Sequence, residues 1–142
     1  MKWKDATDAL IARFYADWTA AHPTVPVDTP NGKPVSVDTE TGAWLRLRFV
    51  PAFARNIAVG GKLRMVWGRA VVNVYTPIGI GDGVAAGYDD DVVDIWDGAH
   101  AAGLDGAIHL DAPTPLVAVP DRDAPFWRSG VSIPFHFDHT PS

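Results

Sequence analysis

The longest alternation of apolar and polar positions covers residues 61–77 (GKLRMVWGRAVVNVYTP). The apolar residues hold odd positions up to Trp67, and after Gly68 they move to even positions such as Val72. A period of two predicts a β-strand, and a glycine where the parity changes predicts a β-bulge. About fourteen residues at ~3.3 Å each would extend ~45 Å, which exceeds the ~35–40 Å width of a small domain. We therefore expect this strand and its turn to project from the core.

A second alternating stretch, residues 44–50, predicts another strand that pairs antiparallel with the first. Its two faces differ in chemistry, because one is apolar and the other is basic. The apolar face consists of Leu45, Leu47 and Phe49, and the basic face carries Arg46 and Arg48.

The connection between these strands, residues 51–61, is longer than the two to five residues of most hairpin turns. It contains Phe53, Ile57 and Val59 beside Arg55. Apolar residues in a long loop need a partner, and two interpretations are open. The loop folds back onto the core, or it becomes ordered against another subunit or protein.

Two amphipathic helices are predicted on either side of this hairpin. In residues 5–21, Leu10, Phe14 and Trp18 form one apolar stripe, and the helix ends at His22-Pro23. In residues 84–99 we expect a second helix with Asp82 as its N-cap. Its predicted buried stripe comprises Val84, Tyr88, Val92, Ile95, Trp96 and Ala99.

Short strands are predicted for the remainder, at residues 25–27, 35–37, 107–110, 116–119 and 127–137. Pro134 predicts that the last of these lies at a sheet edge. Together the elements predict one α+β domain spanning residues 1–142. We expect a mixed, mostly antiparallel sheet with a long protruding β-hairpin and two packed helices.

Composition narrows the functional classes. The 142 residues include no cysteine, which excludes thiol nucleophiles and disulfides and fits a reducing compartment. A net charge of −5 argues against a general nucleic-acid binder, and no apolar run is long enough to span a membrane. Six Trp and six Phe residues predict either an aromatic core or an aromatic oligomer interface.

Candidate catalytic motifs are weak. Gly79–Gly83 lies between a strand and a helix, but Val84 occupies the position where a dinucleotide loop needs a small residue. His136 and Asp138 would share one strand face, which permits an acid–base pair or two metal ligands. Two residues alone do not make a catalytic or metal site, and no serine lies in a nucleophile-elbow motif. We therefore expect no enzyme activity and no cofactor.

The acidic run around residues 89–97 has the composition of a metal site but not its geometry. Consecutive helical residues point about 100° apart, so Asp89-Asp90-Asp91 cannot converge on one ion. Asp90, Asp94 and Asp97 instead share the helix face opposite the apolar stripe. This pattern predicts a solvated or partner-facing acidic surface.

The order of these elements resembles the tail-terminator family of long-tailed bacteriophages, the minor tail protein U-like proteins. The resemblance covers most of the chain through several loose motifs. They are the first helix ending near Trp18, a Pro-rich segment, strand 44–49, a Gly-, Arg- and Ala-rich loop, residues 72–77 (VNVYTP) with Gly79 and Gly81, a helix with Val92 and Ile95-Trp96, and residues 131–135 (VSIPF).

The resemblance implies a subunit of a hexameric ring at the head-proximal end of the tail, assembled in the bacterial cytoplasm. The ring would stop tail-tube polymerisation and contact the tail tube protein and a head–tail connector, without membrane or sequence-specific nucleic-acid binding. Ring contacts join different patches on neighbouring subunits. The predicted interface comprises the loop residues Phe53, Arg55, Ile57 and Val59, the basic residues Arg46, Arg48, Lys62 and Arg64, and the acidic residues Asp90, Asp94 and Asp97.

Two other functions remain open from the sequence. Another phage neck, head–tail completion or minor tail protein would have the same lack of catalytic motifs. A small enzyme or ligand-binding domain would instead depend on a group such as His136 and Asp138.

Overall fold

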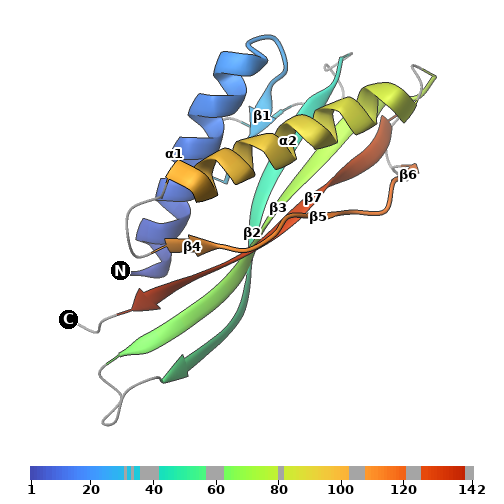
Figure 1. Ribbon diagram of the computed structural model, residues 1–142. Coiled ribbons are helices and arrows are strands. Elements are labelled where there is room, and N and C mark those ends of the chain that lie inside the picture. Colours follow the sequence, from blue (N-terminus) through green and yellow to red (C-terminus); the bar gives the residue numbers. More distant parts are fainter. Residues whose placement is uncertain are drawn as a thin grey trace.

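Two helices pack against one face of a strongly twisted sheet in the described part of the chain (Figure 1). The computed structural model describes residues 1–30, 32, 34–35, 42–56, 63–79, 82–102, 108–120 and 126–139. The elements are α1 (Trp3–Ala21), β1 (Val27–Asp28), β2 (Trp44–Asn56), β3 (Arg64–Pro77), α2 (Asp82–Ala102), β4 (Ile108–Leu110), β5 (Thr114–Pro115), β6 (Val119–Pro120) and β7 (Phe126–His139).

The sheet has the order β1-β2-β3-β7-β4, and β5 and β6 also pair with β7. The pairing is antiparallel except between β1 and β2, which run parallel. This confirms the predicted α+β class, the mostly antiparallel sheet and the two packed helices.

The β2–β3 hairpin extends beyond the helices, as predicted (Figure 1). The prediction that residues 51–61 form a loop is wrong for the first part of that segment, because β2 continues to Asn56 and pairs with β3 as far as Arg64. Phe53 and Arg55 therefore lie on a strand. Ile57, Val59 and Lys62 lie outside the described residues.

The β-bulge predicted at Gly68 lies instead on the neighbouring strand. Pro51 pairs with Gly68 and Phe53 pairs with Trp67, so Ala52 is the extra residue, on β2. β3 pairs with β7 without interruption through Gly68. Even-numbered residues of β3 therefore face the helices along its whole length, and the parity change inferred from the sequence does not occur.

Gly68 is explained by close packing. A Cβ atom at this position would lie 2.6 Å from Cη2 of Trp3 and 3.0 Å from Cζ of Phe135. The Trp3 ring, at the start of α1, thus rests on bare strand backbone where the hairpin leaves the covered part of the sheet. A glycine in a strand often marks such a close approach.

The core lies between the helices and the covered face of the sheet. The predicted stripe of α1 is buried, and the Phe14 ring stacks on Trp18 and on Trp96 of α2 at centroid distances of 6.1 and 5.1 Å. In α2 the predicted Val92, Trp96 and Ala99 are buried, whereas Val84 is 41% exposed.

Pro134 does not lie at an edge, contrary to prediction, because β7 is flanked by β3 on one side and by β4, β5 and β6 on the other. The Pro134 carbonyl oxygen accepts a hydrogen bond from the backbone N of Asp111. Proline has no backbone N–H, and an N–H at this position would point to the same side as the carbonyl oxygen. On that side the pairing strands are interrupted between Leu110 and Thr114, so no strand hydrogen bond is lost. A proline can occupy a central strand at such a gap.

The short strands are predicted less well than the long ones. β4 matches its prediction to within one residue, and β1 overlaps residues 25–27 at one position. The predicted strand 116–119 is wrong, since β5 and β6 flank a non-strand segment there. Val35 is not in a strand, and residues 36–37 lie outside the described ranges. None of the described helices is long and apolar enough to cross a membrane.

Candidate functional site

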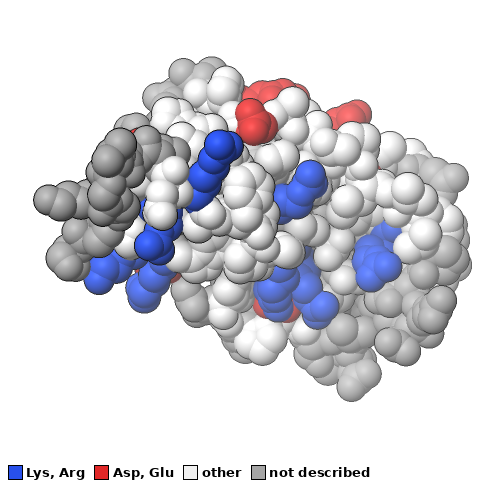
Figure 2. Space-filling view, turned by 90° about the horizontal axis from the view of Figure 1, so that it is seen from below, with Lys and Arg blue, Asp and Glu red and all other residues white. Residues whose placement is uncertain are grey.

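The sheet face opposite the helices, called here the open face, is rich in arginine. Figure 2 views the molecule from this side and shows Lys and Arg side chains distributed over it, with few acidic groups. Cross-strand register places five arginines on this face: Arg46, Arg48 and Arg55 on β2, Arg69 on β3 and Arg128 on β7.

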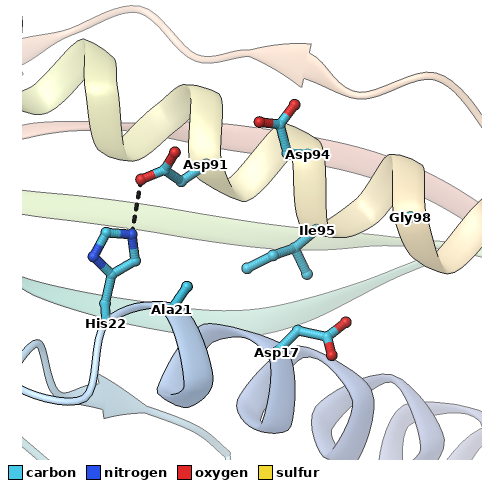
Figure 3. Close-up of a pocket in the computed structure, with 7 residues that line it drawn as sticks. All are labelled: Asp17, Ala21, His22, Asp91, Asp94, Ile95 and Gly98. Atoms are coloured by element: carbon cyan, nitrogen blue, oxygen red, sulfur yellow. Dashed lines mark hydrogen bonds and ion pairs between the residues drawn. The ribbon is translucent and has the colours of Figure 1, made fainter.

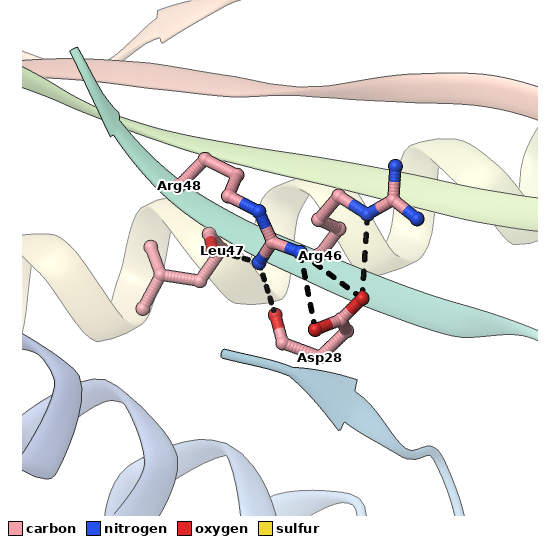
Figure 4. Close-up of polar contacts among 4 residues, drawn as sticks. All are labelled: Asp28, Arg46, Leu47 and Arg48. Atoms are coloured by element: carbon pink, nitrogen blue, oxygen red, sulfur yellow. Dashed lines mark hydrogen bonds and ion pairs between the residues drawn. The ribbon is translucent and has the colours of Figure 1, made fainter. Parts of the chain in front are cut away.

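Asp28 holds two of these arginines (Figure 4). The Arg48 Nη2 lies 3.2 Å from each carboxylate oxygen of Asp28, and the Arg46 Nε lies 3.4 Å from one of them. The Asp28 side chain is only 4% exposed. A buried carboxylate needs such partners, because an unpaired buried charge is strongly destabilising. β1 is therefore fastened to β2 by charge as well as by backbone pairing.

Arg46 is held further by aromatic rings. Its guanidinium carbon lies 5.2 Å from the Trp44 ring centroid and 5.7 Å from that of Tyr75. Those two rings stack on each other at 4.1 Å, and Phe126 packs edge-on against Trp44. Arg46 and Arg48 thus have structural partners within the chain, unlike the free basic surface that the sequence suggested.

Four aromatic rings form a row across the open face near the base of the protruding hairpin. Phe53 on β2 pairs with Trp67 on β3, Trp67 with His136 on β7, and His136 with His109 on β4. Successive ring centroids are 4.6, 5.7 and 4.9 Å apart. We call these four residues the aromatic row. Phe53 is 57% exposed although it stacks on Trp67.

The predicted basic surface divides between the two sides of the sheet. Arg46 and Arg48 lie on the open face, but Arg64 has even parity on β3 and lies on the side that carries the helices. Sequence reasoning missed Arg69 and Arg128. Continuing the alternation of β3 through Gly68 without a parity change would have placed Arg69 beside Trp67.

The exposed surface of α2 is acidic. Asp90, Asp94 and Asp97 are all exposed, as predicted for the face opposite the apolar stripe, and we call them the acidic face. Their neighbours Asp89 and Asp91 point elsewhere and have partners. The Ser129 hydroxyl donates a hydrogen bond of 3.0 Å to Asp89. Burial raises the pKa of Asp89 to about 6, with a smaller contribution from the charge of Asp90.

Asp91 joins the two helices at a shallow pocket (Figure 3). Its carboxylate lies 2.7 Å from Nε2 of His22, whose ring stacks on Trp18 at 4.3 Å. The pocket encloses about 460 Å³ and is lined by Asp17, Ala21, His22, Asp91, Asp94, Ile95 and Gly98. The His22–Asp91 pair fastens the end of α1 to α2, which makes it a structural contact.

His136 and Asp138 share the open face as predicted, but the packing around His136 is aromatic. Its ring lies between those of Trp67 and His109. Within the described residues there is no group of three or more His, Cys, Asp or Glu side chains able to hold a metal ion.

A family model described as phage tail terminator protein matches residues 5–135. The chain belongs to the phage tail terminator family. This confirms the resemblance inferred from the order of elements, and it assigns the chain to a family of structural tail proteins. No curated protein matches the sequence.

The fold is also found in a solved structure. That structure is 20% identical to this chain, with a TM-score of 0.69, and the match covers 100% of this chain and 99% of the other. The similarity establishes a shared fold over the full length.

Proposed function

We propose that this chain forms a ring, of six copies as the family resemblance implies, on the head-proximal end of a phage tail tube. There it ends polymerisation of the tube and presents the surface that joins the tail to the head. Its partners are other copies of itself, the tail tube protein and a head–tail connector protein. It acts by shape and surface chemistry and catalyses no reaction.

The observation that carries this proposal is the β2–β3 hairpin of a tail terminator family member, with residues 50–56 all exposed. Val50 and Phe53 expose half or more of their surface there. Exposed aromatic and aliphatic side chains on a rigid strand are typical of protein interfaces. The predicted interface residues Phe53, Arg55 and Arg64 all lie on this projection.

Electron microscopy of phage particles made with and without the chain tests the proposal. Without it we expect tails of uncontrolled length that are not joined to heads. Complementation with the wild-type chain should restore both properties. Tails of uniform length, firmly joined to heads in the absence of the chain, would refute the proposed function.

Two matched variants test the role of the hairpin in the same assay. Phe53→Ser and Tyr15→Ser each remove an exposed aromatic ring, 57% and 50% exposed respectively, from the hairpin and from α1. We expect Tyr15→Ser to restore normal tails and Phe53→Ser to restore few of them, although both proteins fold. Equal complementation by the two variants would exclude the hairpin from the assembly contacts.

A further inference from the structure

The aromatic row and the acidic face lie on opposite sides of the subunit and have complementary properties. The row is flanked on the open face by Arg55 and Arg69. α2 packs on the other side of the sheet and presents its acidic face to solvent. We propose that the aromatic row and its flanking arginines receive the acidic face of α2 from a second copy of this chain. This inference rests on the ring proposed above, because it names the two surfaces that meet in it.

Charge is the first argument for a second copy as the occupant. Among the described residues, Arg55 and the three carboxylates of the acidic face make no hydrogen bond or ion pair within the chain. Opposite charges on two surfaces of one protein steer its copies together and fix their orientation. The same charges discourage contact between two like faces.

Glycines on α2 give a second argument. Gly83, Gly87 and Gly98 are exposed, and a Cβ atom added to any of them would meet nothing within 4 Å. Glycine within a helix is unfavourable by about 1 kcal/mol relative to alanine, and no packing inside this subunit requires it here. Bare backbone beside Asp90 and Asp94 allows a flat ring from outside to approach the helix closely.

The dimensions of the two surfaces agree. Four neighbouring strands at ~4.8 Å spacing make the aromatic row about 14 Å long. Asp90 and Asp97 are seven residues apart, which is about 10 Å along a helix. The acidic face can therefore lie within the length of the row. Arg55 and Arg69 then lie on either side of it, at the Phe53–Trp67 end of the row.

The contact is heterologous, since one surface meets a different one. Each subunit in such a contact keeps one free surface of each kind, so copies add head to tail until the assembly closes. A closed ring leaves neither the row nor the acidic face exposed. This requirement accounts for the presence of both unpaired surfaces on one small subunit.

The absence of cysteine from the sequence allows a direct test by cross-linking. Two single variants, Arg55→Cys and Asp94→Cys, are mixed on tail tubes that lack the chain and treated with a short bismaleimide. We expect a cross-linked pair in the mixture and in neither variant alone. Cross-links within one variant would indicate contact between like faces and overturn the proposal.

Tail length, measured on the same samples, separates this inference from the proposed function. Terminated tails without a cross-linked pair would refute the contact named here and leave the function intact. Tails of uncontrolled length that still carry the cross-linked pair would refute the proposed function and leave the contact intact. If no cross-link forms and the aromatic row binds a single-stranded oligonucleotide, the proposal is refuted and nucleic acid is the partner of this surface.

A substitution that improves the helix gives an independent test. Gly87→Gln should raise the melting temperature of the subunit, because glutamine is a better helix former than glycine. It should also weaken ring assembly at least tenfold, since the new side chain blocks close approach. Ala16→Gln, at an exposed position of α1, is the matched control and should leave assembly unchanged. Unaltered assembly of Gly87→Gln would contradict the proposal.

Discussion

The two halves of the β2–β3 hairpin belong to one continuous pair of strands but differ in burial. In residues 44–49 and 70–77, the apolar side chains facing the helices are buried, as Leu47 and Val72 illustrate. In residues 50–56 and 64–69, at and beyond the bulge around Ala52, most side chains are exposed or only half-buried. Strand pairing is therefore common to both halves, whereas the placement of the helices decides how much of each strand becomes core. The uncovered half is the part of the hairpin to which we assign the proposed assembly contacts.

The same substitution made at a buried position of β7 and at an exposed position of the hairpin tests this comparison with the largest expected effect. Phe135 is fully buried and faces the helices, whereas Phe53 is 57% exposed. Phe135→Ala should lower the free energy of unfolding by about 3–5 kcal/mol through cavity formation. Phe53→Ala should lower it by about 1 kcal/mol, the value of its stacking on Trp67. Urea unfolding measures both, and equal losses would show that the distal half is also part of the core.

Loss of the Asp28 carboxylate should have an intermediate effect on the covered half. Asp28→Asn leaves Arg46 and Arg48 without a counter-charge, and we expect unfolding to become easier by about 1–3 kcal/mol. The loss is smaller than for a fully buried pair, because the two guanidinium groups retain access to water. Urea unfolding at several salt concentrations measures it.

Arg13→Gln is the matched control for that experiment. It breaks the 2.7 Å Arg13–Asp17 pair on the surface of α1, in which the carboxylate side chain is 38% exposed, compared with 4% for Asp28. We expect a loss of about 0.3–0.5 kcal/mol that disappears at high salt. A similar loss for both variants would mean that the burial of Asp28 adds nothing to the stability of the β1–β2 contact.

The smallest expected effect concerns the change of the unfolding free energy with pH. The pKa of Asp89 is raised to about 6 in the folded chain by burial, from an ordinary value of 3.8. Between these values the folded state binds more protons than the unfolded state, so the unfolding free energy falls as pH rises from about 4 to about 6. Asp89→Asn should remove this slope and stabilise the protein at pH 7 by about 1 kcal/mol, a figure reduced for the half-exposed carboxyl.

Thermal unfolding between pH 4 and pH 8 checks the Asp89 prediction. Asp97→Asn, at an exposed position on the same helix, serves as the control and should keep the wild-type slope. A variant at Asp89 that is less stable than wild type at pH 7 would show that its hydrogen bond from Ser129 outweighs the cost of burying its charge.

Local periodicity predicted the long elements well, because each is governed by residues close in sequence. The stripe of Leu10, Phe14 and Trp18 and the strand character of residues 44–50, 64–77 and 127–137 needed no knowledge of tertiary structure. The faces of β3 before Gly68 and the extension of β2 beyond residue 50 did need it. Features determined by distant residues were not predicted. The bulge lies at Ala52 rather than at Gly68, and the glycine at position 68 is required instead by the packing of Trp3, 65 positions earlier.

The candidate surfaces were predicted only in part for the same reason. The acidic positions follow from helical periodicity alone, and the structure exposes all three of them. Phe53 and Arg55 lie beyond the alternation of residues 44–50, which predicts a loop where β2 continues to Asn56. The pairing of Asp28 with Arg46 and Arg48, and the register that brings Phe53, Trp67 and His136 into line, depend on strand pairing that no local pattern specifies.

The packing of Trp3 on Gly68 fixes the start of the projecting half of the hairpin under the first turn of α1. Beyond that point β3 stays paired with β2 on one side and with β7 on the other as far as Arg64, over about 13 Å of strand. Phe53 and Arg55 are therefore carried on a braced three-stranded ribbon. A surface held in place before it meets a partner loses little conformational entropy on binding.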